Sequence, residues 1–165
     1  MTGNAAQIKM GNPTQGPASN SCGWVAIHNA LTHFGQPVPV AVMVQHFEKS
    51  GGLMTALNSA VNPLAMADYL KSKGYKNETK WFPDSMDDLI RNSASQAGIL
   101  IYINQLDKDG INSHYVFTHY DADSEKFTLY NSNWNYINAH STSSIDYDMK
   151  NRGFVRMGVI TLDEK

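Results

Sequence analysis

The chain has 165 residues, of which 42% are hydrophobic and 17% are charged. This balance is typical of a globular protein and not of a disordered one, so we expect a single domain over residues 1–165. Thirteen basic residues are offset by fifteen acidic ones, which argues against a nucleic-acid-binding surface. The single cysteine excludes internal disulfides and cysteine-rich zinc sites.

The sequence also lacks the apolar segments that take a chain into or across a membrane. No apolar run approaches the ~20 residues that a transmembrane helix needs, and the N-terminus lacks the apolar core of a signal peptide. Residues 1–20 are instead rich in Gly, Asn, Gln, Pro and Ser, which predicts an irregular arm. We expect a cytoplasmic protein, or a domain delivered as part of a larger secreted protein.

The first half of the chain predicts helices. Residues 22–34 carry one apolar stripe at helical spacing, after a possible N-cap at Asn20 or Ser21 and before Gly35. A second helix is expected over 39–49 and a third from Asn62-Pro63 to Gly74, because Asn followed by Pro is typical of a helix start. A capping-box pattern at Ser85 predicts a fourth helix to about Ser95.

The second half predicts strands. The apolar, β-branched run 98–103 indicates a buried strand. Alternating segments follow at 114–121 and 126–130, with turn composition over 122–125 between them, and 154–162 is a further strand. Because helices come first and strands after, the expected fold class is α+β.

Cys22 is the first residue with chemical interest. It lies at or next to the start of the first predicted helix, where unpaired N–H groups and a partial positive charge favour a thiolate. An isolated cysteine is more often an inert apolar residue, but this position weakens that reading. A nucleophilic cysteine also needs a base, and the base needs an orienting partner.

Two histidines, His114 and His119, lie on one predicted strand. Their odd separation puts them on opposite faces, so at most one can face Cys22. We expect His114 to begin the strand, where its side chain can reach a site at the sheet edge, and to act as the base. His119 alternates with Tyr115 and Phe117, which predicts a packing role.

The hairpin over 114–131 predicts a partner for His114. If the turn is Ala122-Asp123, the register places Asn131 opposite His114. If the loop is 122–125, Asn133 lies opposite His114 and Asn131 is its diagonal neighbour on the same face. In both registers an amide lies near the imidazole, although Asn is also common in turns.

The order Cys22, His114, Asn131 resembles the papain-like superfamily of cysteine peptidases. The segment CGWVAIHNAL from Cys22 resembles the cysteine helix of compact bacterial members and of Josephin-type deubiquitinases. HYVF from His114 resembles the histidine strand of double-glycine leader peptidase domains. NSNW from Asn131 is similar to papain's Asn-Ser-Trp, with one extra residue before the Trp.

The resemblance implies a papain-like α+β fold, with the cysteine helix packed on an antiparallel sheet, and a role for each site residue. Cys22 is the implied nucleophile, His114 the base and Asn131 its orienting amide. Gln15 is the implied oxyanion donor, one residue farther from the cysteine than in typical members. Three further residues are expected to shield the site or line the substrate cleft, namely Trp134, Asn133 and Gly23.

The implied activity is hydrolysis of a peptide or amide bond through a thioester acyl-enzyme, with a peptide or protein as substrate and no cofactor. A glutamine deamidase or a peptidase effector acting on a target-cell protein, with an inhibitor or immunity protein as partner, remains an alternative. An inactive papain-like binding module and an unrelated α+β domain also remain open. We expect no metal site, because the aspartates around 107–123 complete no calcium loop. The oligomeric state stays open.

Overall fold

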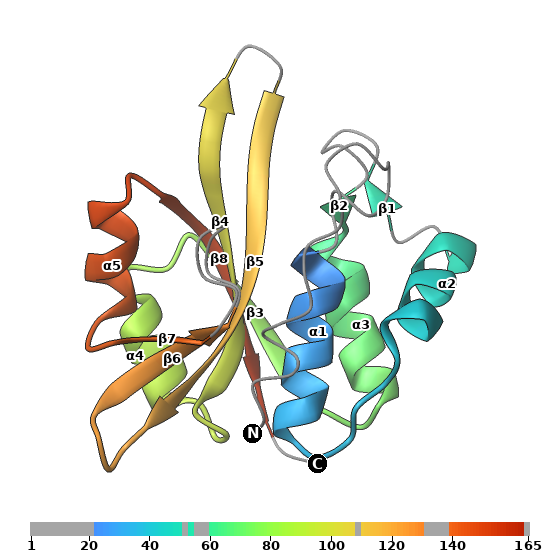
Figure 1. Cartoon of the computed structure of the whole chain (residues 1–165), viewed down its shortest axis with the longest axis horizontal. Helices are drawn as coiled ribbons and strands as arrows, with labels where there is room; N and C mark the ends of the chain where they lie inside the picture. The colour runs from blue at the N-terminus through green and yellow to red at the C-terminus, as the bar shows by residue number, and fades with distance from the viewer. Residues whose placement is uncertain (1–21, 51–52, 55–59, 108–109, 131–138, 164–165) are drawn as a thin grey trace.

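The computed structural model describes residues 22–50, 53–54, 60–107, 110–130 and 139–163 (Figure 1). The helices, in chain order, are α1 (Cys22–His33), α2 (Val40–Ser50), α3 (Pro63–Ser72), α4 (Met86–Asn92) and α5 (Ile145–Asn151). The strands are β1 (Leu53–Met54), β2 (Ala60–Val61), β3 (Asn77–Trp81), β4 (Ala97–Asp107), β5 (Gly110–Asp121), β6 (Lys126–Tyr130), β7 (His140–Thr142) and β8 (Val155–Leu162).

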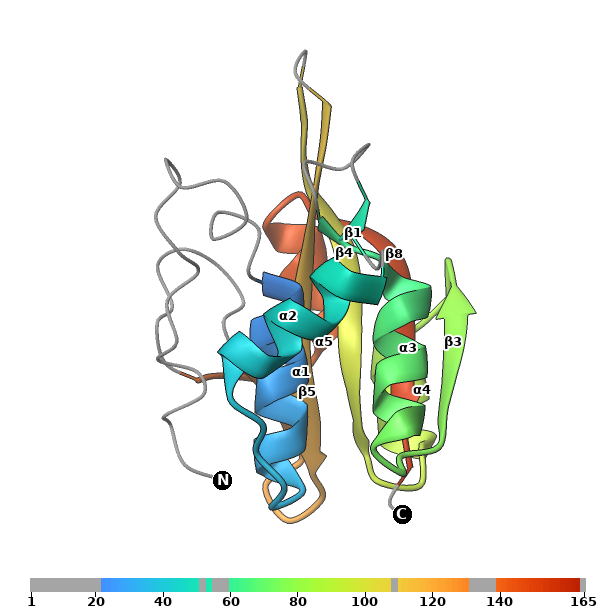
Figure 2. The same cartoon turned by 90° about the vertical axis from the view of Figure 1, so that its right-hand side faces the viewer.

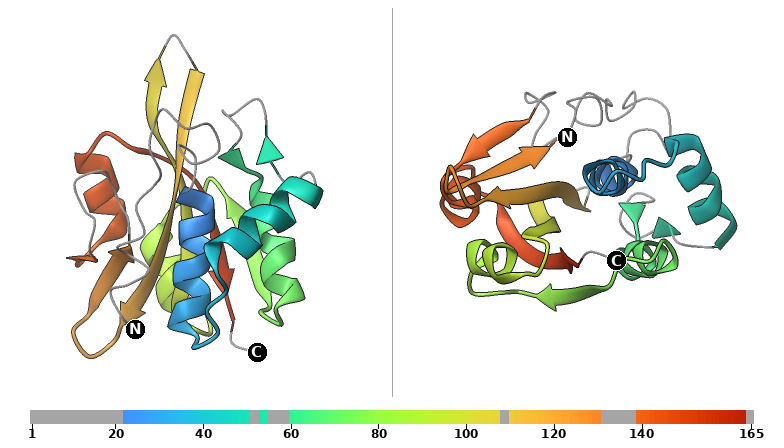
Figure 3. Two further views of the ribbon diagram at one scale, coloured as in Figure 1. Left: turned by 45° about the vertical axis from the view of Figure 1, so that its right-hand side comes forward. Right: turned by 90° about the horizontal axis from the view of Figure 1, so that it is seen from below.

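Six of these strands form one antiparallel sheet with the order β3-β8-β4-β5-β6-β7. Helices α1, α2 and α3 lie on one side of the sheet and α4 and α5 on the other (Figures 1 and 3). Alternate residues of each strand therefore enter two different cores. Tyr115 and Phe117 of β5 pack in the core under α1, whereas Val116 packs in the core under α4 and α5.

The sequence predictions agree with most of this architecture. The expected α+β class, with a helical N-terminal part packed on an antiparallel sheet, is confirmed. The four predicted helices are confirmed as α1 to α4, with ends that differ by up to about three residues, and residues 126–130 form β6 as predicted. Two capping predictions also hold, since Asn62 accepts a hydrogen bond from the N–H of Leu64 and Ser85 from that of Asp88. The predicted N-cap of the first helix, Asn20 or Ser21, lies outside the described residues.

One boundary was predicted wrongly. We expected His114 to begin its strand, but β5 begins at Gly110. Strands β4 and β5 continue their pairing to Asp107 and Gly110, forming a long hairpin that projects beyond the rest of the sheet (Figure 1). The sequence of this extension is mostly polar, so it carries no apolar alternation that a pattern search could detect. His114 consequently lies well inside β5.

Several short elements were not predicted from the sequence. These are β1, β2, β3, β7 and α5. Strand β3 has the sequence NETKW, which lacks apolar alternation because it lies at the edge of the sheet. Helix α5 has 7 residues, which is too short for a periodic pattern to stand out. Within the described residues, no helix is long and apolar enough to cross a membrane.

Candidate functional site

Cys22 is the first residue of α1, as the sequence predicted. The first N–H groups of a helix have no partner within the helix, and they present a partial positive charge. An anion at that position is stabilised, and a thiol there has a lowered pKa in general. Gly23, the next residue, is buried. The start of α1 therefore has the local features of a thiolate site.

Helix α1 packs lengthwise on β5, and the two elements run in the same direction (Figures 1 and 2). At the C-terminal end of the helix, the His33 ring stacks on the His119 ring of β5, with 4.7 Å between centroids. Eleven residues of helix span about 16 Å, and five residues of strand span about the same length. Cys22 and His114 therefore lie at the same height along the α1–β5 pair.

His114 is 3% exposed, in the part of β5 that pairs with β4. It lies directly opposite Tyr102, and the two rings meet edge to face with 5.5 Å between centroids. Paired residues share a face, so the His114 ring lies on the sheet face opposite α1. Among the described residues, β6 pairs with β5 only from Phe117 onward. His114 thus lies at a stretch of β5 where the described sheet ends.

His119 occupies the other face, as its alternation with Tyr115 and Phe117 predicted. Its Nε2 is 2.9 Å from the hydroxyl oxygen of Tyr130, the last residue of β6. Together with His33, these side chains form an aromatic cluster between the C-terminal end of α1, β5 and β6. The cluster lies about 16 Å along the helix from Cys22.

The environment of this cluster disfavours protonation of both imidazoles. Burial, with a smaller contribution from His119, lowers the pKa of His33 to about 4. Burial also lowers the pKa of His119, although Asp121 opposes that shift. A base that pairs with a thiolate must hold a proton near neutral pH. His33 and His119 are therefore poorly suited to that role in both position and electrostatics.

The β5–β6 hairpin has the longer of the two loops considered above. Phe117 pairs with Tyr130 and Asp121 with Lys126, so the loop comprises residues 122–125. Asp121 stabilises it by accepting a hydrogen bond from the N–H of Asp123 at 2.9 Å. The register with an Ala122-Asp123 turn is therefore wrong. The last described pair ends at Tyr130, immediately before Asn131.

The remaining predicted site residues lie outside the described part of the chain. These are Gln15, Asn131, Asn133 and Trp134, together with the side chain of Cys22. Their roles stay predictions. The structure places the start of α1 and His114 at the same height along the α1–β5 pair, and the last residue of β6 is the one before Asn131.

Asn29 is a polar residue of α1 that the sequence analysis did not single out. Its side chain is fully buried, and among the described residues neither its amide nitrogen nor its oxygen has a hydrogen-bond partner. It lies seven positions after Cys22 and four before His33, in the row of helix positions that faces β5. The helical spacing could have identified this row, but only tertiary packing shows that the amide is buried.

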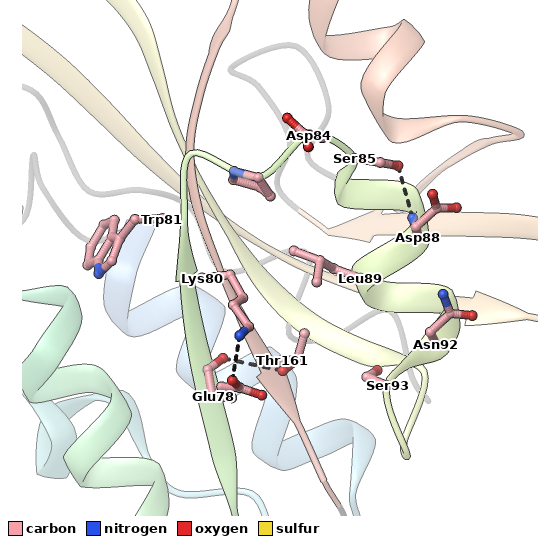
Figure 4. Close-up of a pocket in the computed structure, with 11 residues that line it drawn as sticks. Glu78, Lys80, Trp81, Asp84, Ser85, Asp88, Leu89, Asn92, Ser93 and Thr161 are labelled. Atoms are coloured by element: carbon pink, nitrogen blue, oxygen red, sulfur yellow. Dashed lines mark hydrogen bonds and ion pairs between the residues drawn. The ribbon is translucent and has the colours of Figure 1, made fainter.

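The described residues also form a surface pocket of about 510 Å³ away from this region. It lies between β3 and α4, with Lys80, Leu89 and Asp88 among its lining residues (Figure 4). No group of three or more potential metal ligands occurs among the described residues. The residues that line the pocket include neither a cysteine nor a histidine, and the Ser85 hydroxyl is engaged by Asp146, so the start of α1 remains the candidate active site.

The fold is similar to that of the peptidase domain of Streptococcus ComA, described as a bifunctional ABC transporter involved in a quorum-sensing pathway. The TM-score is 0.58 at 12% sequence identity, and the match covers 89% of this chain and 93% of that chain. At this identity the likeness shows a common fold. No protein-family model and no curated protein sequence matches the chain.

Proposed function

We propose that the chain is a cysteine peptidase or amidase with Cys22 as its nucleophile. The observation that carries the proposal is the position of Cys22 as the first residue of α1, at the height of His114 on the adjacent strand. The fold shared with the ComA peptidase domain supports the same reading. A peptide bond is the proposed substrate, because that neighbour is a peptidase domain.

In the proposed reaction, the Cys22 thiolate attacks the carbonyl carbon of the scissile bond and forms a tetrahedral intermediate. The His114 imidazolium protonates the departing amine, which leaves a thioester. His114 then accepts a proton from water, and the hydroxide attacks the thioester to release the acid and the Cys22 thiolate, which restores the thiolate–imidazolium pair. His114 and the α1 core are on opposite faces of the sheet. The imidazole would therefore reach the Cys22 thiol past the side edge of β5.

The supporting roles follow the resemblance described above. Asn131 accepts a hydrogen bond from one ring nitrogen of His114 and directs the other nitrogen at the thiol. Gln15 and the N–H of Cys22 stabilise the oxyanion, and Trp134 shields the Asn–His hydrogen bond from water. The His119–Tyr130 hydrogen bond supports this arrangement indirectly, since it anchors the residue that precedes Asn131.

The test is the pH dependence of Cys22 alkylation by iodoacetamide. Because the chain has one cysteine, the reaction reports on that thiol alone. We expect an apparent pKa well below the ordinary thiol value of about 8.5, rising in His114→Ala. His46→Ala is the matched control, since His46 is an exposed histidine on α2, and it should leave the profile unchanged.

Two results would overturn parts of the proposal. An ordinary thiol that His114→Ala does not affect would mean that Cys22 is not a nucleophile. A profile that responds to His119→Ala and not to His114→Ala would mean that the base is assigned to the wrong strand face. With a reactive thiol established, peptide cleavage and ammonia release from glutamine separate a peptidase from a deamidase.

A further inference from the structure

Strand β3 is an edge strand, and its outer edge carries the further inference. It pairs with β8 on one side, and no described strand pairs with it on the other. The views in Figures 2 and 3 show β3 along the outside of the molecule, beside α3 and not beneath it. An edge of this kind presents unpaired backbone donors and acceptors.

Hydrogen bonds at the two ends of the β3–β8 ladder show which residues point outward. The N–H of Asp163 donates to the carbonyl of Lys76 at 2.8 Å, and the N–H of Phe82 donates to the carbonyl of Met157 at 2.9 Å. Hydrogen-bonded positions in an antiparallel ladder recur every second residue. The even-numbered residues of β3 therefore bond to β8. The odd-numbered residues direct their N–H and C=O groups to the open edge, namely Asn77, Thr79 and Trp81.

Two residues of opposite charge flank the centre of β3. Glu78 and Lys80 flank Thr79 on either side, and both are exposed. If a second β3 lies antiparallel with Thr79 opposite Thr79, each Glu78 lies opposite the other copy's Lys80. In this register the odd-numbered residues, which direct their backbone groups outward, lie opposite odd-numbered residues of the other copy. A shift by one residue would place them opposite residues whose backbone groups already bond to β8. We propose that two copies of this chain associate through β3 in the antiparallel register centred on Thr79.

The backbone and the side chains agree on this register. Three outward-directed pairs exchange about six backbone hydrogen bonds across the two-fold axis. Glu78 and Lys80 occupy the non-hydrogen-bonded pairs, where side chains approach most closely and opposite charges stabilise. Within one chain these two side chains already form an ion pair of 2.7 Å. Association would extend this pair into a four-charge network on one face of the joined sheets.

Exposed aromatic side chains at the end of β3 strengthen the case. Trp81 is 42% exposed and Phe82 is 71% exposed. In Figure 4, the side chains of Lys80 and Glu78 lie together on one side of β3, whereas the Trp81 ring, which also lines the pocket, extends to the other side of the strand. In the proposed register Trp81 lies opposite the other copy's Asn77. The partner strand would cover part of this apolar surface, which gives association a hydrophobic contribution.

Charged residues on edge strands ordinarily oppose pairing. A single lysine does so because its charge has no counterpart on an incoming strand. Here the glutamate at the mirror position supplies the counterpart, but only for a second copy in the stated register. The same charges therefore exclude most other strands while they favour self-association, as an isologous interface requires.

The association would leave the candidate active site accessible. Two strands, β8 and β4, separate β3 from β5, so the open edge lies about 14 Å across the sheet from β5. The paired surface is small for a permanent dimer, which predicts a weak, concentration-dependent association.

Sedimentation velocity on the full chain tests the register through charge reversal. We expect the wild type to shift toward dimer as concentration rises, and Lys80→Glu to stay monomeric because each new glutamate faces a glutamate. Combining Lys80→Glu with Glu78→Lys restores opposite charges across the axis and should restore the dimer. Lys126→Glu, a charge reversal at an exposed residue of β6, should leave association unchanged.

Two outcomes contradict the proposal. The wild type could remain monomeric at every concentration, or Lys80→Glu could associate as strongly as the wild type. Circular dichroism and the melting temperature show whether each variant is folded.

Cross-linking gives an independent readout that needs no charge change. In a Cys22→Ser background, Thr79→Cys places two thiols across the axis at a hydrogen-bonded pair, where Cα atoms lie about 5.5 Å apart, within disulfide range. We expect rapid formation of a disulfide-linked dimer on mild oxidation. Asn77→Cys in the same background, which also leaves the charges of β3 unchanged, should cross-link much more slowly, because residue 77 lies opposite the other copy's Trp81 and its own counterpart is four residues away along that strand. Equal rates for the two variants would overturn the register.

Discussion

Asp87 and Asp146 each accept hydrogen bonds from the start of the other's helix. Asp87, in the first turn of α4, receives them from α5: the Ser144 hydroxyl at 2.6 Å and the N–H groups of Ile145 and Asp146 at 2.6 and 3.3 Å. Asp146, in the first turn of α5, receives them from α4: the Ser85 hydroxyl at 3.0 Å and the N–H groups of Met86 and Asp87 at 3.0 and 3.1 Å. The two helices that cover one sheet face are thus joined at their N-termini.

This exchange predicts a large and coupled loss of stability on substitution. Asp87→Ala and Asp146→Ala should each lower the free energy of unfolding by about 1–2 kcal/mol, because each leaves helix N–H groups without an acceptor. The double variant should lose less than the sum, by about 0.5 kcal/mol or more. Urea unfolding measures all three.

Asp88→Ala is the matched control for that prediction. Asp88 lies in the same first turn, but within the described residues its carboxylate pairs with Arg91 of the same helix, at 3.1 Å and on an exposed surface. Its loss should therefore cost only about 0.3–0.5 kcal/mol. Equal costs for Asp87→Ala and Asp88→Ala would contradict the proposed importance of the α4–α5 connection.

The stacked His33–His119 pair predicts a loss of stability in acid. Because burial lowers the pKa of His33 to about 4 from its ordinary value of 6.5, the unfolded chain binds a proton at a higher pH than the folded chain does. The contribution of neutral His33 is fully present above pH 6.5 and is lost as the pH falls toward about 4. His33→Phe keeps an aromatic ring there, so its unfolding free energy should fall less over that window. An identical pH profile for the variant would refute this prediction.

Asn29 predicts a gain in stability when its amide is removed. The side chain is fully buried, and neither polar atom has a hydrogen-bond partner in the part of the chain that the structure describes, so no hydrogen bond there offsets the cost of desolvating the amide. Asn29→Leu should raise the free energy of unfolding by about 1–2 kcal/mol, measured by urea denaturation. A loss of stability would instead show that a bound water satisfies the amide.

Two glycines of the sheet predict different responses to the same substitution. A Cβ at Gly98 would lie 2.6 Å from the carbonyl oxygen of Ile160 and 2.6 Å from Cδ1 of Ile90. Gly98→Ala should therefore cost about 1–3 kcal/mol, because the backbone of β8 must move. At Gly158 the nearest atom is Cε3 of Trp81 at 2.9 Å, in a partly exposed ring that can shift. Gly158→Ala should cost clearly less in thermal unfolding, and the reverse order would contradict this reasoning.

The proposed function predicts an order of effects on turnover. Cys22→Ala and His114→Ala should each abolish peptide hydrolysis while the far-ultraviolet circular dichroism stays that of the wild type. Asn131→Ala should reduce kcat by a smaller factor, because the imidazole can partly orient itself without the amide. Gln15→Ala should cost about a hundredfold or more in kcat if Gln15 is an oxyanion donor. Full activity of His114→Ala would refute the assigned base.

The sequence was informative wherever burial and periodicity coincide. The stripe containing Trp24, Ile27 and Leu31 predicted α1, and all three are buried. The strand over 126–130 and the cap at Ser85 were also predicted, because alternation and capping are local properties. The odd separation of His114 and His119 correctly put them on opposite faces.

Local sequence patterns did not predict the features that depend on contacts between residues far apart in the sequence. The hairpin loop could be two or four residues long, and only the pairing of Phe117 with Tyr130 decided between them. Strand β3 carries no apolar alternation, so its place at the sheet edge becomes visible only once β8 lies beside it. The partner of Asp87 is Asp146, 59 residues away, and no spacing rule connects them.

By itself, the sequence determined the class of the fold, the helix that begins at Cys22, and the residue types from which a thiol active site could be built. These follow from hydrophobic periodicity, helix capping and side-chain chemistry, which act over a few residues. The tertiary structure alone decided that Cys22 and His114 lie at the same height along the α1–β5 pair, that His33 and His119 are half-buried with lowered pKa values, and that no described strand pairs with the outer edge of β3. Those outcomes depend on how α1 and the strands pack, because burial and strand pairing are set by contacts between segments far apart in the chain.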